Sequence, residues 1–89
     1  MIQSFADPGT EDVFNGRDTR PARRACPAQL WAVARRKLDQ LDATVSLEAL
    51  RVPPGNRRGQ HSIRINDRFR VCFVWAEAGP ASVETVDYH

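Results

Sequence analysis

The chain has little cysteine and no long apolar segment. Its 89 residues include only two cysteines, and no apolar run is long enough to cross a membrane. Cys26 and Cys72 do not make a disulfide framework or a metal motif, and free thiols fit a reducing cytoplasm. The opening residues, Met1 to Phe5, lack the basic and apolar regions of a signal peptide. We therefore expect a cytoplasmic protein with no membrane partner and one domain over residues 1–89.

Lysine is also scarce, because 12 of the 13 basic residues are arginine, and the charge is unevenly placed. The segment 57–70 holds five arginines and one aspartate, whereas 76–89 holds three acidic residues and no lysine or arginine. The net charge is only +2. This asymmetry indicates a local anion site and not a general polycationic tail.

The stretch from Gly59 to Trp75 predicts two β-strands joined by a tight turn, because apolar residues recur at every second position. A three-residue loop at 66–68 keeps one face of the pair apolar, and its Asn and Asp tolerate left-handed backbone. The expected register on that face opposes Ile65 to Phe69, Ile63 to Val71, and His61 to Phe73.

On the other face of this hairpin, the same register opposes Arg64 to Arg70 and Ser62 to Cys72. Directly opposed like charges are unfavourable unless they are well solvated or an anion binds there. Phosphate is a suitable anion, because guanidinium groups bind it through two parallel hydrogen bonds. The alternative is a solvated arginine-rich edge that discourages aggregation.

A short first helix is predicted over Pro8–Asn15, because an Asp-Pro pair at 7–8 is a favoured helix start and Gly16 is a suitable C-cap. The polar residues 17–24 are expected to form a connector. A second helix begins near Pro27, with apolar residues at intervals of three and four. These apolar positions are Leu30, Val33 or Ala34, Leu38 and Leu41.

The remaining segments complete a small domain. Ser46 is expected to cap a short helical turn, and Pro53–Asn56 forms a rigid turn toward the hairpin. Ile2–Phe5 is either an edge strand or a stub that docks on the sheet. A loop at 76–81 leads to a last strand over Ser82–Tyr88, either face of which can meet the core. The expected fold is α+β, with N-terminal helices packed on a small, mainly antiparallel sheet.

The chain ends in Asp87, Tyr88 and His89, a carboxylate, a phenol and an imidazole in succession. Imidazole moves a proton at neutral pH, a carboxylate orients it or acts as base, and tyrosine stacks on a base or binds phosphate. With Arg64 and Arg70, such a set would stabilise a pentavalent phosphorane while a 2′-hydroxyl attacks the neighbouring phosphate. The alternative is a terminal tripeptide without a chemical role. No cluster has metal-ligand spacing, so we expect neither a metal nor a cofactor.

At this point the sequence resembles the HigB toxins of bacterial type II toxin–antitoxin systems, members of the RelE/ParE superfamily that includes plasmid maintenance killer proteins. The resemblance also covers residues 2–5 and 34–43, and so nearly the whole chain. Four motifs in order carry it: Leu-Arg-Val-Pro-Pro-Gly-Asn-Arg (50–57), Arg-Gly-Gln-His-Ser-Ile-Arg-Ile-Asn-Asp (58–67), Phe-Arg-Val-Cys-Phe-Val-Trp (69–75) and Val-Glu-Thr-Val-Asp-Tyr-His (83–89).

The resemblance implies a ribosome-dependent mRNA endoribonuclease that works without metal in the A site of the 70S ribosome, inhibiting translation and arresting growth. It implies neutralisation by HigA, a helix-turn-helix antitoxin, and contact with operator DNA only through that antitoxin. The catalytic residues it implies are Asp87 and His89 for proton transfer or orientation, Tyr88 for positioning the nucleotide, and Arg70 for charge. The implied RNA or ribosome contacts are Arg57, Arg58, His61, Arg64 and Arg68. His61 has an alternative role in the core, opposite Phe73.

The chain departs from the family at Asn56-Arg57-Arg58-Gly59, where members usually carry several more residues that supply basic or histidine groups. Three hypotheses follow. Arg57 and Arg58 substitute for those groups in an active toxin, or the chain is a weakened or inactive homologue that still binds its antitoxin. The third is a ParE-like inhibitor of DNA gyrase, since fold does not fix function.

Overall fold

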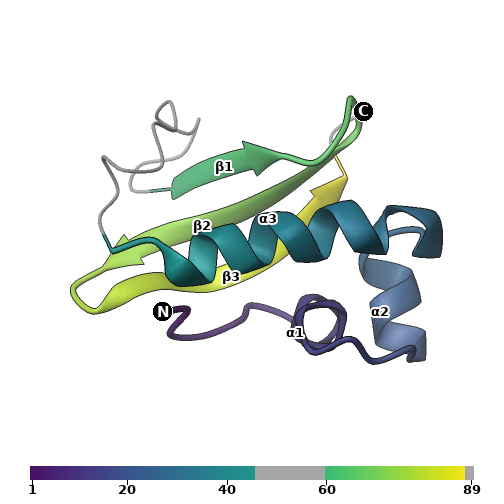
Figure 1. Cartoon of the computed structure of the whole chain (residues 1–89), viewed down its shortest axis with the longest axis horizontal. Helices are drawn as coiled ribbons and strands as arrows, with labels where there is room; N and C mark the ends of the chain where they lie inside the picture. Colours follow the sequence, from purple (N-terminus) through teal and green to yellow (C-terminus); the bar gives the residue numbers. More distant parts are fainter. Residues whose placement is uncertain (46–59, 88–89) are drawn as a thin grey trace.

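The computed structural model describes residues 1–45 and 60–87, in which helices pack on one face of a three-stranded antiparallel sheet (Figure 1). The helices are α1 (Pro8–Phe14), α2 (Arg20–Ala25), the 3-10 turn η1 (Ala28–Leu30) and α3 (Trp31–Ala43). The strands are β1 (Gln60–Arg64), β2 (Phe69–Ala76) and β3 (Gly79–Asp87), in the order β1-β2-β3. This arrangement confirms the predicted α+β class.

Helix α1 begins as predicted, because the Asp7 carboxylate accepts a hydrogen bond of 2.6 Å from the backbone N–H of Thr10, and Pro8 occupies the first turn. The helix ends one residue earlier than predicted. Gly16 follows with φ +74°, in the left-handed region that glycine adopts at helix ends without steric cost.

The prediction of a polar connector at 17–24 is wrong, because α2 begins within this segment and ends at Ala25. Thr19 caps this helix by accepting a hydrogen bond of 3.1 Å from the N–H of Ala22, and a proline again occupies the first turn. Ala22 is the one fully buried residue of α2. Such a short helix therefore shows no apolar stripe in the sequence. The feature that could have predicted it is the N-cap threonine followed by a proline in the first turn.

Helix α3 buries Ala34, Leu38 and Leu41 completely, so Ala34 and not Val33 holds the core position that the sequence left open. Trp31 is partly buried and donates from Nε1 to the Cys26 carbonyl oxygen at 3.0 Å. In Figure 1 this helix runs across the front of the sheet. The expected turn capped by Ser46 and the rigid turn at Pro53–Asn56 lie outside the described residues.

The predicted hairpin register is confirmed, with His61 opposite Phe73, Ile63 opposite Val71 and Arg64 opposite Arg70. The loop is held differently from the expectation, because none of residues 66–68 has a positive φ. Instead the Asn66 Oδ1 accepts from the N–H groups of Arg68 at 2.9 Å and Phe69 at 2.8 Å. The asparagine side chain thus shapes the turn by hydrogen bonding to the backbone.

Strand β3 begins at Gly79, so the second turn is shorter than the predicted loop at 76–81. Val83 and Thr85 face the core, with 0% and 9% of their surface exposed. The buried hydroxyl of Thr85 has a polar partner there, because Thr10 Oγ1 donates to Thr85 Oγ1 at 3.3 Å. The Thr85 backbone N–H in turn donates to Thr10 Oγ1 at 2.9 Å. The N-terminal segment docks alongside this strand, with a parallel bridge between Phe5 and Val83. Of the two predictions for this segment, the one that it docks on the sheet is confirmed.

Candidate functional site

The two faces of the sheet separate the predicted site residues. Side chains alternate along a strand, and Phe69 and Val71 face the buried core. Asp87 is the register partner of Phe69, so it lies on the face that the helices cover. Arg70 is the register partner of Arg64 on one side and of Val86 on the other, so these arginines lie on the opposite face. The structure therefore brings Arg64 and Arg70 together but does not bring Asp87 to their face.

The two opposed arginines point their guanidinium groups in different directions. Arg64 forms an ion pair with Asp67 in the turn and donates from Nε to the Asn66 carbonyl oxygen at 3.2 Å. Arg70 donates from Nη1 to Ser62 Oγ at 3.3 Å. The like charges are therefore relieved by polar partners within the hairpin. A guanidinium group carries five N–H donors and binds phosphate through two parallel hydrogen bonds.

Asp87 is held by Arg68, the last residue of the β1–β2 turn. The Arg68 Nε donates to Asp87 Oδ1 at 2.8 Å and its Nη2 donates to Oδ2 at 2.9 Å, so the pair is bidentate. The hydrogen bond and charge of Asp87 raise the pKa of Arg68. The Arg68 guanidinium also lies over the Phe69 ring, 5.7 Å from its centroid. The resemblance implied an RNA or ribosome contact for Arg68, and the sequence did not predict its pairing with Asp87.

His61 lies on the helix-covered face, the alternative that the sequence offered for it. Its ring centroid is 5.8 Å from that of Phe73, and the planes are inclined by 33°. Its Nδ1 is buried, and none of the described residues forms a hydrogen bond with it. The remaining predicted site residues lie outside the described part of the chain: Arg57, Arg58, Tyr88 and His89.

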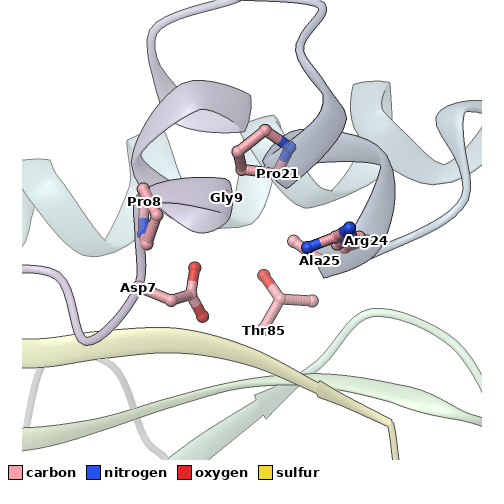
Figure 2. A pocket seen from close by; sticks show the side chains of 7 residues that line it. All are labelled: Asp7, Pro8, Gly9, Pro21, Arg24, Ala25 and Thr85. Carbon is pink, nitrogen blue, oxygen red and sulfur yellow. The ribbon is translucent and has the colours of Figure 1, made fainter.

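Sequence reasoning did not anticipate a pocket of about 350 Å³ between the first two helices and β3. Figure 2 shows Asp7 and Thr85 beside the strand, with Pro21, Arg24 and Ala25 on the side of α2. The Asp7 carboxylate caps α1, and Thr85 faces the helices, so this pocket opens on a different face from Arg64 and Arg70.

Neither a metal-binding cluster nor a membrane-spanning helix is found among the described residues. Within 1–45 and 60–87, no three His, Cys, Asp or Glu side chains gather in a way that could hold a metal ion. In the same part of the chain, no helix has the length and apolar character needed to cross a membrane.

The described residues thus form helices, an antiparallel hairpin and a third strand, with Arg64 and Arg70 on the sheet face opposite the helices. The comparisons with known proteins agree with this arrangement. A family model described as the RelE-like toxin of the type II toxin–antitoxin system HigB matches residues 3–89. The chain is also similar to Toxin HigB-1 of Vibrio cholerae serotype O1, with 37% identity over 85 residues that cover 86% of each chain.

The class of protein is thus a RelE-like toxin of a type II toxin–antitoxin system. Within that class, the chain belongs to the HigB-like family. HigB family toxins are typically ribonucleases, and they pair with antitoxins.

Proposed function

We propose that this protein is a ribosome-dependent mRNA endoribonuclease that works without metal in the A site of the 70S ribosome, and that a HigA-type helix-turn-helix antitoxin neutralises it. The observation that carries the proposal is the family match, because it runs over residues 3–89 and so includes Arg70 and the terminal Asp-Tyr-His. The arginine-bearing face of the hairpin adds support, since arginines bind RNA phosphates through charge and paired hydrogen bonds.

In the proposed reaction the 2′-hydroxyl of one nucleotide attacks the adjacent phosphorus and the 5′-oxygen leaves. Arg70 stabilises the charge that develops on the phosphorane, and His89 moves a proton. Tyr88 positions the nucleotide, and Asp87 takes part in proton transfer or in orientation. Arg57, Arg58 and Arg64 bind RNA or the ribosome in this scheme. His61 would join them only if its ring left the contact with Phe73.

The test is induction of the untagged protein in a bacterium, followed by mapping of the 5′ ends of a translated mRNA and of the same mRNA without its start codon. We expect growth arrest and cuts within codons on the translated message alone. The variants Arg70→Ala, Asp87→Ala and His89→Ala should each relieve the arrest. A C-terminal tag is avoided, because the proposed site includes residues 87–89.

The other two hypotheses give different outcomes in the same experiment. Arrest with an SOS response and no mRNA cleavage would indicate a gyrase inhibitor. No arrest and no cuts, together with tight binding of a HigA-type antitoxin, would mean that the short segment at 56–59 has removed the chemistry. Arrest of equal strength by all three variants would contradict the proposed roles of Arg70, Asp87 and His89.

A further inference from the structure

The bidentate pair between Arg68 and Asp87 is unlike the other ion pairs of the described residues. It joins positions 19 apart in the sequence, whereas the pairs of Arg17 with Asp12, Arg23 with Asp18 and Arg64 with Asp67 are local. It therefore links the β1–β2 turn to the end of β3. A pair within one turn or connector fixes only its own backbone, whereas this pair fixes the relative position of two elements.

Arg68 makes two other contacts besides the pair with Asp87. Its backbone N–H is held by Asn66 Oδ1 at 2.9 Å, and its guanidinium lies over the ring of the next residue, Phe69. Phe69 in turn pairs with Asp87 across β2 and β3. These contacts and the planar guanidinium hold the Arg68 side chain in the orientation that pairs with Asp87.

The exposed fractions of the two side chains differ. Asp87 has 34% of its side-chain surface exposed, while Arg68 has 56%. Asp87 is thus the less exposed partner, and both of its carboxylate oxygens accept a hydrogen bond from Arg68. A carboxylate whose two oxygens both accept from one planar guanidinium is fixed in its orientation.

We propose that Arg68 is a positioning residue for mRNA cleavage, which holds the Asp87 carboxylate as a fixed anion at the end of β3. The inference rests on the proposed function, and it assigns to Asp87 the orienting role and not the role of general base. It also replaces the assignment of Arg68 as an RNA contact. An RNA contact contributes to affinity, whereas a positioning residue contributes to the rate of the chemical step.

The test is single-turnover cleavage of mRNA on programmed ribosomes, with toxin in excess and its concentration varied. Arg68→Gln should lower the maximal rate about ten- to a hundredfold, since small misplacement of a catalytic group costs that much. The toxin concentration at half-maximal rate should stay within about twofold. Arg68→Lys keeps the charge without the planar fork and should be intermediate. Arg68→Gln combined with Asp87→Asn should be no slower than Asp87→Asn alone, because the two residues act through one contact.

Arg23→Gln is the matched control, because Arg23 forms an exposed pair with Asp18 at 2.8 Å on a different element. This variant should cleave like the parent. The proposal is overturned if Arg68→Gln raises the half-maximal concentration and leaves the maximal rate unchanged, or if Arg23→Gln loses as much rate. It is also overturned if the losses from Arg68→Gln and Asp87→Asn multiply in the double variant.

A second measurement does not depend on activity. In NMR spectra of the isolated toxin, the Nε–H of Arg68 should exchange slowly with water, and Asp87→Asn should remove that protection. Rapid exchange in the parent would overturn the pair itself. If the parent shows a protected Nε–H but never cleaves mRNA, the proposed function fails while the contact remains. The two failures are therefore distinguishable.

Discussion

Gly9 is the residue at which α1 and α2 come closest, and it carries a sharp prediction at the residue scale. A Cβ at this position would lie 2.2 Å from the Pro21 carbonyl oxygen and 3.0 Å from the Cβ of Ala25. At a solvent-exposed position inside a helix, replacing Gly by Ala raises the stability of the protein by about 1 kcal/mol. Here the backbone contact reverses the sign, because a carbonyl oxygen cannot move as a flexible side chain does. Gly9→Ala should therefore lower the free energy of unfolding by about 1–3 kcal/mol, as overpacking does.

Urea denaturation, monitored through tryptophan fluorescence, checks this prediction. Glu11→Ala, at an exposed position of the same helix, is the control and should change stability by less than about 0.5 kcal/mol. A Gly9→Ala variant more stable than the parent would show that the two helices are not in this close contact.

Other single residues show why only part of the site was predictable. The opposition of Arg64 and Arg70 follows from alternation and turn length, which are both local in the sequence. The pairing of Arg68 with Asp87 depends on how β2 and β3 are aligned, and their register shifts between Cys72 and Val74. Charge alone could not distinguish an arginine that binds RNA from one that binds a carboxylate.

At the scale of elements, caps decide where the short helices form. Thr19 accepts from the Ala22 N–H at 3.1 Å and donates from its hydroxyl to Asp12 Oδ2 at 2.7 Å, so it links the start of α2 to α1. Thr19→Ala removes both contacts. We expect it to lower the free energy of unfolding by about 1–2 kcal/mol. Thr19→Ser keeps the oxygen and should stay within about 0.5 kcal/mol of the parent. Equal stability of the alanine and serine variants would contradict the capping role.

The elements also differ in how well their sequences predict them. The hairpin has alternating branched and aromatic residues around one turn, so its register was predictable. In β3 both faces carry polar residues, and the buried Thr85 hydroxyl finds its polar partner in Thr10, whose Oγ1 donates to it at 3.3 Å. That partner lies 75 residues away in the sequence. Helix α2 was missed because its six residues bury too little to show a period.

At the scale of the whole molecule, the two faces of the sheet carry different kinds of residue. The helix-covered face carries the core, including Phe73 and Val83, with the His61 ring beside Phe73, while the other face presents Arg64 and Arg70. Asp87 stands at the strand end on the core side and is linked to the turn by Arg68.

The core that supports both faces contains a titratable group, Cys26, of which 1% is exposed. Burial raises the pKa of Cys26 to about 11 from its ordinary value of 9.0. The unfolded chain therefore loses this proton near pH 9, whereas the folded protein keeps it until about pH 11. Between these values the unfolded state binds fewer protons, so stability falls as the pH rises. The total loss from this group is roughly 2–3 kcal/mol, from a difference of about two pKa units.

The measurement is urea unfolding at a series of pH values from 8 to 11, on the parent and on Cys26→Ala. The variant has a cavity and is less stable at every pH, so the comparison concerns the slope with pH and not the absolute value. The other groups that titrate in this range are the same in both proteins and cancel. We expect the stability of the parent to fall more steeply than that of Cys26→Ala above pH 9. Parallel slopes would mean that Cys26 ionises as easily in the folded protein as in the unfolded chain, and that the core admits water at the junction of α2 and α3.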